Sequence, residues 1–272
     1  MSLLMSQFGL DGSVALVTGA SRGIGKAIAI AMAEAGADVA ISARTESSLA
    51  GTAERIRSLG RNVSLHAADL RDPDTPERII DATIASHGHF NLLVHNAASF
   101  PSDADGALDI TPLGESGEEA WDSTIEVNLK ASLRLFREAE SHLASQPNAA
   151  ALIISSAAAM CSTAGSEIYG MTKAAQIGLV KNLCVPWARQ GIRVNALSPG
   201  VIRTDATRKI QNSPELAQLI LTDIPLGRLG DTGELACTAV YLCSRAGAYV
   251  TGQTVYVDGG LTVPTLGVRQ PS

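Results

Sequence analysis

Short runs of apolar residues alternate along this chain with longer segments in which apolar residues recur at the spacing of a helix. The short runs are rich in Val, Ile, Leu and Ala. Such continuous apolar runs are typical of strands that are buried on both faces of a parallel sheet. The expected strands are Val14–Val17, Asp38–Ser42, Asn62–Ala67, Leu92–His95, Ala151–Ser155, Ile192–Ser198 and Thr254–Val257.

The intervening segments are long enough for the crossover helices that consecutive parallel strands require. This alternation predicts an α/β fold: a Rossmann-type, doubly wound parallel sheet flanked by helices. We expect one domain over residues 1–272, with residues 1–9 as a tail. A (β/α)8 barrel is the alternative, which the Gly-rich turn after the first strand disfavours. The expected helices are Gly25–Ala35, Ser47–Leu59, Pro76–Ser86, Glu118–Leu143, Tyr169–Arg189 and Gly233–Ser244.

Two connections are longer than this alternation needs. The segment Ser99–Glu119 is rich in Pro, Gly and Asp, and Arg203–Gly230 contains Pro214, Pro225 and helical pieces of its own. Loops of this length in a compact α/β domain are usually functional. Both segments follow a strand at the carboxyl edge of the sheet, where open α/β sheets bind ligands. We therefore expect both to border a substrate site.

Composition and charge narrow the classes of function. Hydrophobic residues make up 46% of the chain, and 21 Lys+Arg against 27 Asp+Glu give a net charge of −6. An acidic chain with 4% aromatic residues lacks the basic, aromatic surface typical of nucleic-acid binding. The Cys and His residues lack metal-site spacing, and the first residues lack a signal-peptide pattern. We expect a cytoplasmic protein with no metal, nucleic-acid or membrane partner.

A glycine-rich turn joins the first expected strand to the first expected helix. Its sequence, TGASRGIG over Thr18–Gly25, has G-x-x-x-G-x-G spacing and not the common G-x-G-x-x-G. Glycines there allow a tight turn and the close approach of a diphosphate, and the helix N-terminus supplies unpaired N–H groups. The turn therefore predicts a dinucleotide site. Its predicted binding residues are Gly19, Ser21, Arg22, Gly23, Ile24 and Gly25.

The end of the second expected strand bears on the choice of cofactor. Proteins that bind NAD place Asp or Glu about 20 residues after the turn, whereas NADP binders have an Arg nearby for the 2′-phosphate. Here the strand ends Ile41–Arg44 without the acid, and Arg22 offers a second cation. The pattern predicts NADP(H), with NAD(H) as the alternative if Arg44 is merely solvated and Glu46 binds the ribose.

Tyr169 and Lys173 lie four residues apart in an expected helix, on one face of it. A neighbouring ammonium favours the phenolate, so we expect Lys173 to lower the pKa of Tyr169 from about 10 toward neutrality. Such a tyrosine can pass a proton to or from an alcohol or carbonyl oxygen. The Y-x-x-x-K pattern alone is weak, but Ser156 stands 13 residues before Tyr169, where its hydroxyl can bind the same oxygen. Ser155 is its rival.

With these motifs the chain resembles the short-chain dehydrogenase/reductase family over roughly Leu10 to Val263. The spacing between Ser156 and Tyr169 fits the family better than Ser155 does. The motifs that carry the resemblance are Thr18–Gly25, Asp69-Leu70, His95–Ala98, Asn128, Ser156, Tyr169 with Lys173, Ser198–Gly200, Thr251–Gln253 and Val257–Gly260.

The resemblance implies a role for each matched residue. Tyr169 would be the general acid/base, Lys173 would lower its pKa and bind the nicotinamide ribose, and Ser156 would orient the substrate carbonyl. Asn128 would hold a water that links Lys173 to solvent. The other implied cofactor contacts are Asp69 and Leu70 at the adenine, Asn96 and Ala97 at the nucleotide, Pro199, Gly200 and Ile202 at the carboxamide, and Thr204 at the pyrophosphate.

The resemblance thus predicts an NADP(H)-dependent oxidoreductase that interconverts a carbonyl and an alcohol on a small organic substrate. A non-catalytic, nucleotide-sensing protein of this fold is the alternative, which the intact set Asn128, Ser156, Tyr169 and Lys173 disfavours. A lyase or epimerase that uses the dinucleotide transiently is a third. The family also implies a homo-oligomer, a dimer or tetramer, paired through the helices Glu118–Leu143 and Tyr169–Arg189, with a contact at 261–268.

Overall fold

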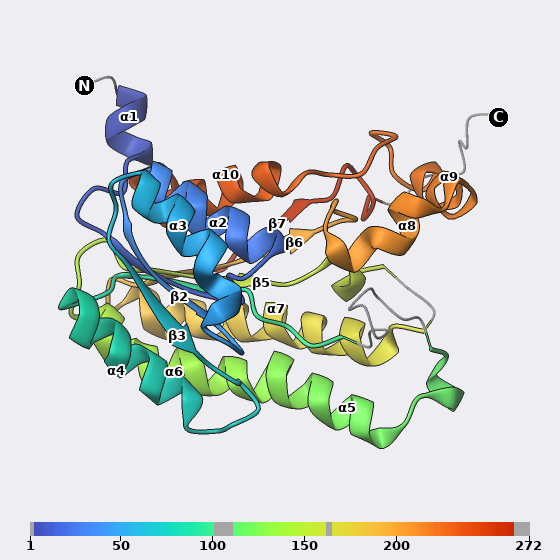
Figure 1. The fold of residues 1–272 in the computed structure, drawn as a ribbon, viewed down its shortest axis with the longest axis horizontal. Coiled ribbons are helices and arrows are strands. Elements are labelled where there is room, and N and C mark those ends of the chain that lie inside the picture. The colour runs from blue at the N-terminus through green and yellow to red at the C-terminus, as the bar shows by residue number, and fades with distance from the viewer. Residues whose placement is uncertain (1–2, 101–110, 162–164, 264–272) are drawn as a thin grey trace.

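A seven-stranded sheet forms the centre of the protein (Figure 1). The computed structural model describes residues 3–100, 111–161 and 165–263. All paired strands are parallel, in the order β3-β2-β1-β4-β5-β6-β7, which confirms the predicted doubly wound fold. The strands are β1 (Val14–Thr18), β2 (Asp38–Ala43), β3 (Val63–Ala67), β4 (Leu92–His95), β5 (Ala150–Ile154), β6 (Arg193–Pro199) and β7 (Thr254–Val257).

The apolar runs are buried on both faces, because successive side chains of a strand point to opposite sides of the sheet. In β1, Ala15 and Val17 belong to one core cluster, and Val14 and Leu16 to the other. Helices α2, α3 and α10 contribute to the first core, and α4, α6 and α7 to the second (Figure 1). The helices are α1 (Leu3–Phe8), α2 (Gly23–Glu34), α3 (Ala50–Ser58), α4 (Thr75–His87), α5 (Glu118–Ile125), α6 (Ala131–Ala144), α7 (Glu167–Ala188), α8 (Arg208–Asn212), α9 (Pro214–Thr222) and α10 (Thr232–Cys243).

Local chemistry accounts for several helix ends. Pro76 stands in the first turn of α4, where its missing N–H costs no helical bond. Gly88 ends that helix in the left-handed region, with φ 81°, and its N–H bonds to the carbonyl of Ile84. Helix α10 begins with a capping box, in which Asp231 and Glu234 each bond the backbone of the other.

Two expected elements differ from the structure in an informative way. The helix expected over Glu118–Leu143 has the expected extent, but a π-helix over Glu126–Lys130 interrupts it between α5 and α6. Such π-turns concentrate at functional sites. The helix expected from Gly25 begins at Gly23, so the end of the glycine turn forms the first turn of α2.

The strand order predicts where on the sheet a ligand would bind. The chain adds β2 and β3 on one side of β1 and then returns to β4 on the other side, so the strand order reverses between β1 and β4. Ligands of open α/β sheets bind outside the carboxyl ends of the strands at such a reversal. The sheet therefore brings together the segments that follow Thr18, His95, Ile154 and Pro199.

Candidate active site

A cavity of about 450 Å³ opens at this carboxyl edge. All the predicted site residues line it except Gly25 and Asn128, which are buried. The predicted residues that line it are Gly19, Ser21, Arg22, Gly23, Ile24, Arg44, Asp69, Leu70, Asn96, Ala97, Ser156, Tyr169, Lys173, Pro199, Gly200, Ile202 and Thr204.

The glycine turn forms part of the cavity wall and has no room for a side chain at Gly19 or Gly25. Gly19 and Gly23 have φ 68° and φ 56°, in the left-handed region that favours glycine. Asn96 supports the turn from β4, since its Nδ2 donates to the carbonyls of Thr18 at 3.2 Å and Gly19 at 3.1 Å. A Cβ at Gly25 would lie 2.3 Å from both Asn96 Nδ2 and the carbonyl oxygen of Gly19.

The Gly25→Ala variant is therefore expected to be less stable by about 1–3 kcal/mol, since overpacked cores lose about that much. The added methyl group would push Asn96 away from the turn that it supports. Urea denaturation measures the free energy of unfolding. Gly51→Ala in α3 is the matched control, because its Cβ would meet only Lys26 Nζ, at 4.0 Å. A helical alanine is favoured over glycine by up to about 1 kcal/mol, so equal stability of the two variants would contradict the argument.

Arginines that follow each of the first three strands line the cavity. Arg22 and Arg44 line the cavity and are exposed, and Arg22 approaches Asp205 only to 3.9 Å. Arg71 was not anticipated: its guanidinium donates to both carboxylate oxygens of Asp69, at 2.5–3.1 Å. This hydrogen bonding is the largest cause that holds the pKa of Asp69 below its ordinary value.

The end of β4 is joined to the glycine turn by a threonine. The hydroxyl oxygen of Thr18 accepts from the backbone N–H groups of Asn96 and Ala97, at 3.1 Å each. It also bonds Nδ1 of His95 at 3.0 Å. Burial, and then the charge of Lys173, lower the pKa of His95 to about 3, so this imidazole is neutral at pH 7. These bonds hold the two walls of the cavity together.

Tyr169, Ser156 and Lys173 line the same cavity. The Ser156 hydroxyl lies within hydrogen-bonding reach of the Tyr169 phenol. Lys173 Nζ lies 5.5 Å from the Tyr169 ring centroid. The rival serine is engaged elsewhere, since Ser155 Oγ donates to the carbonyl of Lys173 at 2.9 Å. The geometry therefore favours Ser156 over Ser155.

The structure corrects the expectation that Lys173 lowers the pKa of Tyr169 toward neutrality. Burial raises the pKa of Tyr169 to about 12, and the hydrogen bond with Ser156 only opposes this rise. Burial also lowers the pKa of Lys173 to about 7. Removal from water penalises both the phenolate and the ammonium, and here that penalty outweighs the attraction between them.

Asn128 supports the site from the π-helix without lining the cavity. Its Oδ1 accepts from the N–H of Ser99 at 2.7 Å, and its Nδ2 donates to the carbonyl of Ser99 at 2.8 Å. The carbonyl oxygen of Asn128 accepts from Gln176 Nε2 at 2.7 Å and Ser132 Oγ at 2.6 Å. The side chain of Gln176 also accepts from Lys173 Nζ at 3.1 Å, so it links Lys173 to Asn128, and the water that the resemblance implies at Asn128 stays a prediction.

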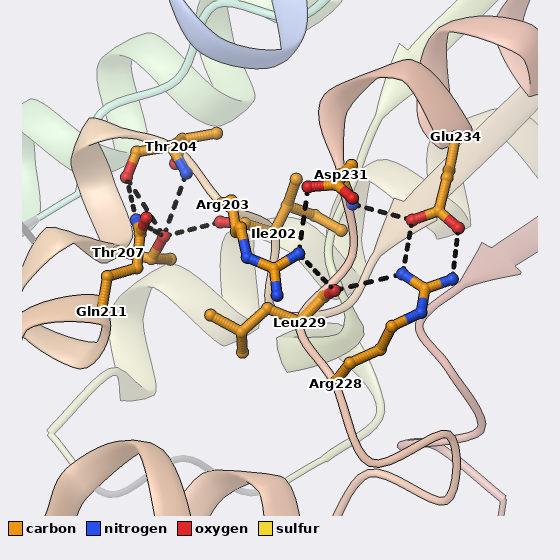
Figure 2. A network of polar contacts seen from close by, with 9 residues as sticks. All are labelled: Ile202, Arg203, Thr204, Thr207, Gln211, Arg228, Leu229, Asp231 and Glu234. Carbon is orange, nitrogen blue, oxygen red and sulfur yellow. Dashed lines mark hydrogen bonds and ion pairs between the residues drawn. The ribbon is translucent and has the colours of Figure 1, made fainter. Parts of the chain in front are cut away.

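The base of the segment 203–230 is tied down by polar contacts (Figure 2). Arg203 and Arg228 each donate to the carbonyl of Leu229, at 3.2 Å, and Arg228 also pairs with Glu234. On the other side, Thr207 Oγ1 donates to the carbonyl of Ile202 at 2.6 Å. Residues 204–207 line the cavity, and the expected role of the segment at a substrate stays a prediction.

The other long connection reaches the cavity at its start. Ser99 and Phe100 line the cavity, and the ring of Phe100 stands edge-on to Tyr169 with centroids 6.2 Å apart. The stretch 101–110 of the expected substrate loop, and 264–268 of the expected subunit contact, lie outside the described residues. Over the described ranges, no group of three or more His, Cys, Asp or Glu could hold a metal ion. Within the same ranges, no helix has the length and apolarity needed to cross a bilayer.

Three residues at or behind the cavity make contacts that the sequence did not predict. Arg71 and Phe100 line it, and Gln176 is fully buried behind it. Gln176 carried a signal: it is a polar residue three positions after Lys173 in a helix face that is otherwise apolar or small. Phe100 lies in the segment Ser99–Glu119 that was expected to border the substrate site, but its ring contact with Tyr169 and the pairing of Arg71 with Asp69 carried no sequence signal.

The parallel sheet, with a glycine turn at its reversal point, defines a dinucleotide-binding α/β protein. The chain matches the family model described as enoyl-(acyl carrier protein) reductase over residues 19–262. It is 35% identical over 260 residues to 2-dehydro-3-deoxy-D-gluconate 5-dehydrogenase of Pseudoalteromonas atlantica, covering 94% of this chain and 98% of that protein. The chain belongs to the short-chain dehydrogenase/reductase family and is an oxidoreductase.

Two solved structures show how closely the fold is shared. A gluconate 5-dehydrogenase from Burkholderia cenocepacia, in complex with NADP and tartrate, has a TM-score of 0.88 at 31% identity and covers 96% of this chain and 100% of its own. A 7α-hydroxysteroid dehydrogenase, complexed with NADH and 7-oxo glycochenodeoxycholic acid, has a TM-score of 0.87 at 30% identity. It covers 96% of this chain and 98% of its own.

Proposed function

We propose that this oxidoreductase uses NADP(H) to interconvert a carbonyl and an alcohol on a small organic substrate. The observation that carries the proposal is one cavity lined both by the glycine turn and by Tyr169, Ser156 and Lys173. A nucleotide sensor would need the glycine turn alone. Relatives act on substrates as different as a sugar acid and a steroid, so the proposal stops at the class of reaction.

The glycine turn fits a dinucleotide diphosphate. Gly19 and Gly23 have no side chain to fill the wall, and Thr204 flanks it, since its Cγ2 would lie 3.5 Å from a Cβ at Gly23. The first amides of α2 have no partner within the helix, and Arg22 does not cap them with its side chain. Arg22 and Arg44 would hold the 2′-phosphate. When bound, NADP(H) supplies or accepts the hydride.

Tyr169 and Ser156 would handle the substrate oxygen. With a pKa of about 12, the Tyr169 phenol holds its proton at pH 7. A carbonyl oxygen placed between both hydroxyl groups would accept hydrogen bonds from both. Tyr169 would donate its proton as the carbonyl is reduced and take it back as the alcohol is oxidised. Lys173, 5.5 Å from the ring centroid, would favour the transient phenolate.

The homo-oligomer stays a prediction, as does the cytoplasmic location. Exposed apolar side chains on the two helices implicated by the family are consistent with a subunit contact: Leu133 on α6 is 49% exposed, and Met171 and Val185 on α7 are 54% and 61% exposed. Isolated exposed apolar side chains are common, but three on neighbouring helices suit a buried face in an assembly.

The proposed function is tested by following nicotinamide absorbance with the full chain, NADPH or NADH, and a panel of ketones, aldehydes, sugar acids and steroids. We expect turnover of at least one carbonyl, with a higher kcat/KM for NADPH than for NADH. Binding of NADPH without turnover of any compound in either direction would favour the nucleotide sensor instead. Equal kcat/KM with the two cofactors would refute the assignment of NADP(H).

A further inference from the structure

Gln176 is a fully buried polar residue directly behind the candidate active site. It lies on α7 three residues after Lys173, so the two side chains are neighbours on one face of the helix. Burying an amide is costly unless each of its polar atoms finds a partner. Its contacts therefore bear on why this position is polar.

The amide of Gln176 bridges the lysine and the π-helix. Its Oε1 accepts from Lys173 Nζ at 3.1 Å, and its Nε2 donates to the carbonyl of Asn128 at 2.7 Å and to Ser132 Oγ at 3.2 Å. A lysine ammonium can only donate and a backbone carbonyl can only accept, so this orientation of the amide is the one that satisfies both. The oxygen of Gln176 therefore faces the lysine.

Two neutral carbonyls hold the ammonium of Lys173. The second is the backbone carbonyl of Ile154 at the end of β5, 2.8 Å from Nζ. Acceptors that point at an ammonium favour its charged form, and burial, which lowers the pKa of Lys173 to about 7, opposes them. Because the pKa of Lys173 lies near 7, losing one acceptor would change the fraction of Lys173 that is charged at neutral pH.

The ionisable groups around Lys173 do not replace these acceptors. Tyr169 on the same helix and His95 at the end of β4 are its ionisable neighbours, and both are uncharged at pH 7. On the π-helix, Glu126 is paired with Lys130 at 3.0 Å. Within the described part of the chain, no carboxylate forms an ion pair with Lys173.

We propose that Gln176 is a positioning residue that holds Lys173 between β5 and the π-helix and favours its ammonium form. Its effect on turnover rests on the proposed function, whereas its effect on the proton affinity of Lys173 does not. Gln176 and Ser132 also both donate hydrogen bonds to the carbonyl oxygen of Asn128. That carbonyl therefore accepts from two side chains, one on α6 and one on α7.

The direct test is an NMR titration of the lysine side chains in the full chain, labelled with 13C at Cε. The signal of Lys173 is assigned by its loss in Lys173→Met. The titration is simple because the chain has few lysines: Lys26, Lys130, Lys173, Lys181 and Lys209.

Two substitutions are expected to move the Lys173 pKa in opposite directions. Gln176→Met keeps the length of the side chain and removes the acceptor, so the pKa should fall by about one unit, a tenfold change in proton affinity. Gln176→Glu places a carboxylate at the same point, so the pKa should rise by at least about one unit. If Gln176→Glu does not fold, Gln176→Asn, whose amide is too short to reach, should lower the pKa as Gln176→Met does.

Val180→Ala separates this effect from a loss of packing. Val180 is fully buried on the same helix, one turn beyond Gln176. This variant should lower the melting temperature and leave the Lys173 pKa unchanged. An unchanged pKa in Gln176→Met would overturn the proposal, as would equal shifts in Gln176→Met and Gln176→Glu.

Kinetics then connect the proposal to turnover. With a substrate found in the panel, the pH profile of kcat should move with the Lys173 pKa, to lower pH in Gln176→Met and to higher pH in Gln176→Glu. If the NMR shifts occur and the profile does not follow them, Gln176 does not act on turnover. An inactive wild type would refute the proposed function alone, because the NMR result stands without it.

Discussion

Replacing Tyr169 by Phe is expected to lower kcat by about 10²–10⁴-fold, the usual contribution of a general acid/base. The substitution removes one oxygen atom and leaves the ring, which stands against Phe100. The glycine turn and the arginines that line the cavity are untouched. The Kd for NADPH, measured by fluorescence titration, should therefore change little.

The direction of the pH dependence is part of this prediction. Because burial holds the pKa of Tyr169 at about 12, the phenol is protonated and ready to donate at pH 7. Alcohol oxidation needs the deprotonated form, so its rate should rise with pH toward that value, while carbonyl reduction should not. The residual activity of Tyr169→Phe should lose this rise in oxidation.

Tyr241→Phe is the matched control for this substitution. Tyr241 lies on α10, and its ring packs 6.2 Å from that of Phe8, away from the cavity. The control should keep the activity of the wild type. Retention of a tenth or more of the wild-type kcat, as a rough bound, by Tyr169→Phe would remove Tyr169 from the proposed mechanism.

Replacing Arg44 by Ala is expected to raise the KM for NADPH by about 10–100-fold and to leave the KM for NADH nearly unchanged. The basis is a charge-assisted contact with the 2′-phosphate, a group that NADH lacks, worth about 1.5–3 kcal/mol. Arg44 is exposed where it lines the cavity after β2, and its charge acts on the Asp69 carboxyl without a direct ion pair among the described residues. Initial rates at saturating substrate with each cofactor measure the effect.

Variants of two further arginines serve as controls for Arg44→Ala. Arg57→Ala, on the outer face of α3, should change neither KM, since Arg57 does not line the cavity. Arg71→Ala frees Asp69 and should alter the KM of both cofactors alike, because the adenine is common to them. If Arg44→Ala raised both KM values equally, Arg44 would have a general role in binding and not one in cofactor choice.

The strands and most helices could be predicted because their signals are local. The strand expected over Leu92–His95 matches β4, and that over Thr254–Val257 matches β7. Continuous burial requires continuous apolar residues, which the sequence displays directly. The π-helix over Glu126–Lys130 has no such signal. The carbonyl of Asn128 is directed to Gln176, a residue 48 positions later in the chain.

Sequence alone determined the α/β class, the glycine turn and the residue types that line the cavity, because periodicity, glycine and chemically reactive side chains are visible one position at a time. The tertiary structure decided which of them act together. It bonded Ser155 to the backbone carbonyl of Lys173, paired Arg71 with Asp69, and placed Gln176 behind Lys173. It also reversed the expected shift of the Tyr169 pKa, since removal from water depends on everything that packs around a group.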